Sequence, residues 1–247
     1  MPFRLLSTLL LVASSLAGVA GVRAETSAPA VLAEAAAVDA RWRDSFDAFA
    51  AADRLRAPQP GGVLFVGSSS IRLWDGLESQ FEVGLPGIVK RGFGGSRMAD
   101  CTRYLDQLVL PYKPRLVVVY AGDNDLAEGR SPRDVLGDFR RFVSGVRATL
   151  PDTRIAYLSI KPSPLREILL PRIHEANALI ADFVSKTSNL DYIDVHSKML
   201  GPDGRPRADL YGADALHLNA AGYALWKAVI GQHLRLPAQR LAGSGAP

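Results

Sequence analysis

Hydrophobic residues along the chain follow two alternating patterns. Residues 63–66 and 116–120 are short apolar runs, typical of strands buried on both faces of a sheet. Weaker strand-like runs lie at 88–89, 155–160 and 192–195, and segments with helical spacing of apolar residues lie at about 98–110, 132–149, 172–187 and 220–234. Two of these segments carry helix start signals, Ser131-Pro132 and Asn219. The alternation predicts an α/β fold, a three-layer αβα sandwich around a central, mainly parallel five-stranded sheet.

The first 24 residues have the pattern of an export signal. Arg4 precedes the apolar run 5–22, and Val22 and Ala24 are aliphatic or small residues at the positions that determine cleavage. A retained membrane anchor is the alternative, but small residues dilute the second half of the run. No later segment approaches the roughly 18 apolar residues needed to span a bilayer. We therefore expect cleavage after Ala24, a periplasmic or secreted mature protein, and no stable membrane insertion after cleavage.

The remaining chain divides into an arm, one domain and a tail. Residues 25–60 are rich in alanine, and Trp42, Phe46 and Phe49 are spaced as on one face of a helix, which predicts an N-terminal helical arm. Residues 61–236 hold all the strand-and-helix units and form one domain. Residues 237–247 predict a flexible tail.

Charge and cysteine content exclude several classes of function. The formal net charge is +4, and it falls to +2 without Arg4 and Arg23. The arginines are scattered and form no basic tract, so we expect no nucleic-acid partner. Cys101 is the one cysteine, so no internal disulfide can form. Its helix-like surroundings favour a buried small apolar residue over a nucleophile.

Polar and glycine-rich motifs follow the first three predicted strands. They are the serines 68–70, the glycine-rich 92–95, and Gly-Asp-Asn-Asp at 122–125. Because ligands of open parallel sheets bind at the carboxyl ends of the strands, we expect these motifs to gather there. Each motif has a plainer local interpretation: the serines can cap a helix, the glycines can form a tight turn, and Asn124 can form a turn.

Asp214 and His217 are the strongest candidate for acid–base chemistry. A histidine base needs one ring nitrogen held by an acceptor, so that the other can face a hydroxyl. A serine hydroxyl at a strand end would be the nucleophile that such a base activates.

The sequence indicates neither a metal site nor a cofactor. Asp123 and Asp125 invite a calcium interpretation, but Ala127 stands where a third oxygen ligand belongs. The other histidines lack partners at zinc spacing and are expected on the surface or in helix packing: His174, His196 and His233.

Taken together, the four motifs resemble the sequence blocks of the SGNH or GDSL-type hydrolases, especially the branch of platelet-activating-factor acetylhydrolase subunits and bacterial arylesterases. The matching segments are 65–71, 92–96, 122–125 and 214–217, and the likeness covers about 60–235. The resemblance implies a flavodoxin-like SGNH hydrolase fold for 61–236 and a serine esterase. It implies Ser69 as nucleophile, His217 as base and Asp214 as its orienting acid, with Ser69, Gly95 and Asn124 forming the oxyanion hole.

Two positions depart from the pattern of that family. Ser68 stands where the family has aspartate, which leaves some choice among the three serines, although the glycine at the strand end favours Ser69. Asp123 stands where many members have threonine and brings a negative charge beside an anion-binding site. We expect Arg97 or Arg91 to neutralise it.

The resemblance limits the substrate only to a class. It implies small-molecule or glycan esters with short acyl chains, such as O-acetyl sugars, aryl or alkyl esters and lysophospholipids. A catalytically silent carbohydrate- or envelope-binding protein on the same fold is the alternative. Trp74, Phe93 and Tyr120 could line an acyl pocket, although core packing is favoured for each. The sequence does not specify an oligomeric state.

Overall fold

The computed structural model describes Met1 and residues 28–81 and 86–235, with side chains for Met1 and for residues 40–81 and 86–234. Apart from Met1, the expected signal segment lies outside the described residues, and so does the expected tail. The chain divides into two units, Met1–Arg41 and Trp42–Pro247. Apart from Met1, the described part of the first unit is helical and belongs to α1 (Ala28–Leu55). None of the described helices is long and apolar enough to cross a membrane.

The second unit contains the predicted sheet. Its strands are β1 (Val63–Gly67), β2 (Ile88–Gly92), β3 (Leu116–Tyr120), β4 (Arg154–Leu158) and β5 (Leu190–Ile193). All neighbouring strands are parallel, in the order β2-β1-β3-β4-β5. This is the flavodoxin-like order, in which the chain reverses direction across the sheet between β1 and β3. The predicted αβα fold is confirmed.

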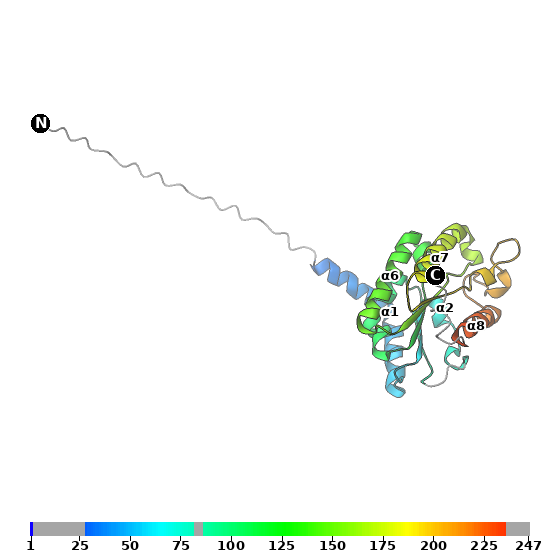
Figure 1. The fold of residues 1–247 in the computed structure, drawn as a ribbon, viewed down its shortest axis with the longest axis horizontal. Helices are drawn as coiled ribbons and strands as arrows, with labels where there is room; N and C mark the ends of the chain where they lie inside the picture. Colours follow the sequence, from blue (N-terminus) through cyan, green and yellow to red (C-terminus); the bar gives the residue numbers. More distant parts are fainter. Residues whose placement is uncertain (2–27, 82–85, 236–247) are drawn as a thin grey trace, which may run out of the picture. The chain divides into compact units, whose positions relative to one another are not determined.

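Helices cover both faces of this sheet (Figure 1). The longer ones are α6 (Pro132–Thr149), α7 (Leu170–Ser185) and α8 (Ala220–Arg235). The shorter ones are α2 (Ser69–Arg72), α3 (Met98–Arg103), α4 (Leu105–Leu108) and α5 (Asp123–Ala127). Single 3₁₀ turns are η1 (Leu77–Ser79), η2 (Leu110–Tyr112), η4 (Ser197–Met199) and η5 (Ala208–Leu210). The longer 3₁₀ segment η3 (Pro164–Leu169) is kinked at Arg166.

Alternate residues of the strands face the two helical layers. Phe65 and Ala156 belong to one apolar cluster with Trp226 of α8. On the other face, Tyr157 packs against Phe139 of α6, with ring centroids 4.8 Å apart. Because side chains alternate along a strand, adjacent positions such as 156 and 157 reach opposite layers. The strands β1 and β3 are buried along their whole length and apolar on both sides, as their sequences indicate.

The helix start signals predicted at Ser131 and Asn219 are confirmed. The Ser131 hydroxyl accepts from the amide of Asp134 at 3.1 Å, and the Asp134 carboxylate accepts from the amide of Ser131 at 2.9 Å, which makes a capping box. Asn219 Oδ1 accepts from the amide of Gly222 at 3.0 Å and caps α8. These local bonds begin α6 and α8 at the residues that the sequence indicates.

The helix expected over 98–110 is wrong as a single element. It breaks at Tyr104, whose φ and ψ of −105° and 25° are not helical, and its last turn is the 3₁₀ turn η2. Pro111 has no amide proton to donate, which favours ending the α-helix before it.

Candidate active site

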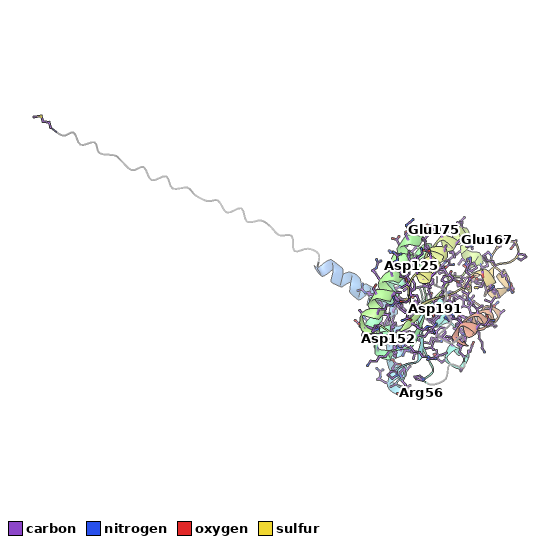
Figure 2. The ribbon with its side chains drawn as sticks, viewed as in Figure 1. Arg56, Asp125, Asp152, Glu167, Glu175 and Asp191 are labelled. Atoms are coloured by element: carbon purple, nitrogen blue, oxygen red, sulfur yellow. The ribbon has the colours of Figure 1, made fainter. Side chains whose placement is uncertain are left out.

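The active-site candidates meet where the order of strands reverses. Gly67, the last residue of β1, pairs with Gly92 of β2 on one side and with Tyr120 of β3 on the other. The three loops that follow these strands therefore start next to one another. Figure 2 shows Asp152, before β4, and Glu167, after it, at opposite ends of the second unit.

Gly67 has to be glycine for this arrangement to form. Its φ is +146°, and a Cβ there would lie 1.9 Å from the carbonyl oxygen of Tyr120. The missing side chain lets the chain turn sharply after β1, where the amide of Ser68 donates to that carbonyl at 3.1 Å. The turn brings Ser69 to the start of α2.

Of the three consecutive serines, Ser69 alone is not buried. Ser68 and Ser70 are 3% and 2% exposed, whereas Ser69 is partly exposed. Ser68 is the N-cap residue of α2, but its side chain makes no capping hydrogen bond. The interpretation of this serine as a helix cap therefore fails. The Ser69 hydroxyl lies 3.0 Å from His217 Nε2, although 148 positions separate the two residues in the chain.

Asp214 holds the other side of the imidazole. Its Oδ2 lies 2.6 Å from His217 Nδ1, and its Oδ1 accepts from the amides of Leu216 and His217 at 3.0 and 2.9 Å. These two amides, and then the imidazole, lower the pKa of Asp214 well below its usual range. Ala215 has a φ of 54°, an uncommon conformation that closes the turn. Asp214 is therefore an ionised acceptor that orients His217.

Gly95 and Asn124 come from the neighbouring strand ends. Gly95 follows β2 and has a φ of 71°, which favours glycine. Asn124 lies in the first turn of α5, and its Nδ2 donates to the carbonyl oxygen of Ser96 at 3.0 Å. This bond links the third motif directly to the second, beside Gly95.

These groups support a defined chemistry. A hydroxyl, an imidazole and a carboxylate in hydrogen-bonding sequence can activate the hydroxyl as a nucleophile. Backbone amides at a helix start and a side-chain amide nearby can bind a developing oxyanion.

The family model for GDSL-like lipases and acylhydrolases matches residues 61–225. The chain belongs to this family. As a GDSL-like acylhydrolase, it is a carboxylic ester hydrolase. No protein with curated annotation matches its sequence.

Solved structures share the fold of this GDSL-like acylhydrolase. A protein described as a platelet activating factor from Streptococcus pneumonia has a TM-score of 0.68 and 20% identity over 85% of this chain and 100% of its own. A GDSL-like lipase from Bacteroides thetaiotaomicron has a TM-score of 0.63 and 19% identity over 76% of this chain and 96% of its own. An acetylxylan esterase from Geobacillus stearothermophilus has a TM-score of 0.56 and 14% identity over 72% of this chain and 96% of its own.

The expected neutralisation of Asp123 by Arg97 or Arg91 is wrong. Arg97 binds Asp100 at 3.0 Å and Glu128 at 3.4 Å. Arg91 pairs with Asp53 of α1. Both arginines precede Asp123 in the sequence, and other carboxylates hold them.

Lys161 and Arg166 neutralise Asp123 in this acylhydrolase. Lys161 Nζ lies 2.8 Å from Asp123 Oδ2, and Arg166 Nη1 lies 2.7 Å from Oδ1. Burial raises the pKa of Asp123, but the two cations outweigh burial and lower it. Both cations follow β4, which neighbours β3 in the sheet. Sequence analysis missed them, although Lys161 directly after an apolar strand was a usable signal.

The aromatic side chains considered for an acyl pocket belong to the core. Trp74, Phe93 and Tyr120 are each fully buried. Cys101 is fully buried too, and burial raises the pKa of its thiol, so it is no accessible nucleophile. Their packing roles follow the favoured predictions.

Asp125 is a buried carboxyl next to the site. It is fully buried and accepts from the amide of Met98 at 3.2 Å, while burial raises its pKa to about 6. Because this pKa lies above the usual value of about 3.9, the native state holds the proton more tightly than the unfolded chain. This carboxyl therefore makes folding less favourable as pH rises through that interval.

We expect this effect to disappear in Asp125→Asn. Between pH 4 and pH 7 the free energy of unfolding of the wild type should fall by about 2–3 kcal/mol relative to the variant, because only the wild type must ionise a buried carboxyl. Urea unfolding at several pH values measures the difference. Parallel pH profiles for the two proteins would contradict the prediction.

Proposed function

We propose that this protein is an exported serine esterase that hydrolyses short-chain acyl esters through an acyl-enzyme. The observation that carries the proposal is the contact of 3.0 Å between Ser69 Oγ and His217 Nε2, together with the 2.6 Å contact between His217 Nδ1 and Asp214. His217 takes the proton of Ser69 as the hydroxyl attacks the ester carbonyl. It then protonates the departing alcohol.

The second half of the cycle repeats the first with water. His217 takes a proton from water, the hydroxide attacks the acyl-enzyme, and Ser69 recovers its proton as the acid leaves. In both halves the carbonyl oxygen becomes negatively charged. We assign its stabilisation to the amides of Ser69 and Gly95 and to the Asn124 side chain. A donor of this kind contributes about 3 kcal/mol to lowering the barrier. The residues of this mechanism require no metal or organic cofactor.

A short acyl group on a small or glycan alcohol is the substrate class that we favour. Trp74, Phe93 and Tyr120 are fully buried and are not available to line a long acyl channel. Among structures of the same fold are an acetylxylan esterase and a carbohydrate esterase. We propose O-acetylated sugars as the first class to test. The sequence pattern of residues 1–24 supports cleavage after Ala24 and export, which the mass of the exported protein would check.

The experiment compares chain lengths and traps the acyl-enzyme. We expect mature protein to hydrolyse 4-nitrophenyl acetate faster than the octanoate ester, and to release acetate from acetylated xylan. A fluorophosphonate should label the peptide containing Ser69, as mass spectrometry would show. A label elsewhere, or hydrolysis that persists in the fully labelled protein, would overturn the proposal. Absence of both hydrolysis and labelling would favour a silent binding protein.

A further inference from the structure

Arg166 contacts Asn124, the side-chain donor of the proposed oxyanion hole. It belongs to η3, which connects β4 to α7 at the carboxyl edge of the sheet. The amide of Leu165, its neighbour, donates to the carbonyl oxygen of Ala215 at 3.0 Å. This bond ties η3 to the turn that carries Asp214 and His217. The Arg166 side chain is only 18% exposed.

The guanidinium of Arg166 contacts two adjacent residues of α5. Its Nη2 donates to Asn124 Oδ1 at 3.1 Å, and its Nη1 lies 2.7 Å from Asp123 Oδ1. The other oxygen of Asp123 accepts from Lys161 Nζ at 2.8 Å, and the Lys161 side chain is 1% exposed. The four side chains thus form one chain of charge-assisted contacts that ends on the Asn124 amide.

These contacts determine which way the Asn124 amide points. A primary amide has an accepting oxygen and two N–H donors. Arg166 occupies the oxygen of Asn124, and the carbonyl of Ser96 takes one N–H. If the amide were flipped, its N–H donors would point at the guanidinium of Arg166, which can only donate. The flip is therefore disfavoured, and one N–H remains for the site.

The same contacts affect the charge near the developing anion. Asp123 alone would oppose an oxyanion held by its neighbour Asn124. Lys161 and Arg166 bring two positive charges to this one carboxylate, so the cluster carries a net positive charge. A cation on the amide oxygen also polarises the amide and strengthens its N–H donors.

We propose that Arg166 is a positioning residue of the esterase, which holds the Asn124 amide with an N–H toward the oxyanion, while Lys161 and Arg166 together offset the charge of Asp123. The inference rests on the proposed function, because Arg166 acts through Asn124 and not on the substrate. Arg166 therefore supports kcat and contributes little to KM.

A double-mutant cycle tests the proposal on 4-nitrophenyl acetate. We expect Asn124→Ala to lower kcat by about a hundredfold or more, as loss of an oxyanion donor does. Arg166→Met should lower kcat about 10- to 100-fold, with KM changed less than about twofold. In the Asn124→Ala background the same substitution should change kcat less than about twofold, because its target is gone.

Two further variants separate positioning from folding. Arg166→Lys keeps a positive charge near Asp123 but cannot bridge to Asn124 at the same time, so most of the loss in kcat should persist. Arg205→Met is the matched control: Arg205 is exposed and pairs with Glu167, next to Arg166, at 2.7 Å. This control should retain wild-type kcat. If Arg166→Met fails to fold, Arg166→Lys completes the cycle with Asn124→Ala.

The outcomes distinguish the inference from the proposed function. The role of Arg166 would be overturned, without affecting the proposed function, if Arg166→Met and Arg166→Lys both kept wild-type kcat. It would also be overturned if the effect of Arg166→Met on kcat simply multiplied with that of Asn124→Ala. A loss expressed only in KM would overturn it too, since positioning of the oxyanion donor acts on the transition state. Undiminished hydrolysis in Ser69→Ala would instead remove the proposed function on which the inference rests.

Discussion

Ser69→Ala is expected to lower kcat for ester hydrolysis by about 10⁴- to 10⁶-fold, because the variant has no hydroxyl to form the acyl-enzyme. The substitution removes one partly exposed oxygen, whose hydrogen bond in the described part of the structure is to His217. We therefore expect the free energy of unfolding to stay within about 1 kcal/mol of the wild type. Steady-state kinetics and urea unfolding measure the two quantities.

The neighbouring serines provide the matched control. Ser68→Ala and Ser70→Ala remove the same atom within one residue of Ser69, but both side chains are buried. We expect each variant to keep kcat within about tenfold of the wild type, since neither hydroxyl contacts His217. A loss in Ser70→Ala as large as that in Ser69→Ala would show that the nucleophile had been assigned to the wrong serine.

Asp214→Asn is expected to lower kcat about 10³- to 10⁴-fold. The asparagine oxygen can still accept from the amides of Leu216 and His217, so the turn should keep its shape. Its amide nitrogen would then face His217 Nδ1 as a donor. This forces the proton onto Nε2, the nitrogen that must accept the proton of Ser69. Kinetics on 4-nitrophenyl acetate measure the loss.

The ionisation of Asp214 sets the pH range of this effect. Because the pKa of Asp214 is lowered, its stabilising bonds are fully present above the ordinary pKa of about 3.9 and are lost only as pH falls through the folded value. Above about pH 5 the carboxylate therefore stays ionised, and the deficit of Asp214→Asn should persist throughout this range. Recovery of wild-type kcat at neutral pH would contradict the role of Asp214.

Asp209→Asn is a suitable control for the second prediction. Asp209 is an exposed carboxylate in the same C-terminal segment, where it pairs with Arg207 at 2.7 Å. Exposed pairs of this kind contribute little to stability. The variant should keep wild-type kcat. A loss of kcat in Asp214→Asn alone would then come from the orientation of His217 and not from the removal of a negative charge from this part of the surface.

The sequence alone determined the features that depend on neighbours in the chain. Apolar strands alternating with helical segments predicted the αβα sheet, and Ser131 and Asn219 indicated where two helices begin. The Asp214–His217 pair was visible because the two residues lie three positions apart, and one tight turn brings the carboxylate to the imidazole. Local hydrogen bonds and periodicity follow directly from the order of residues.

Only the tertiary structure decided which distant groups meet. The order of strands brings Ser69 to His217 and places β4 beside β3, so that Lys161 and Arg166 reach Asp123. The sequence favoured Ser69, but its exposure relative to Ser68 and Ser70 depends on the turn at Gly67. The prediction of Arg97 or Arg91 as the partner of Asp123 was wrong because a salt bridge depends on distance in space. The ends of the neighbouring strands β3 and β4 bring Lys161 and Arg166 close to Asp123, although they lie farther from it along the chain.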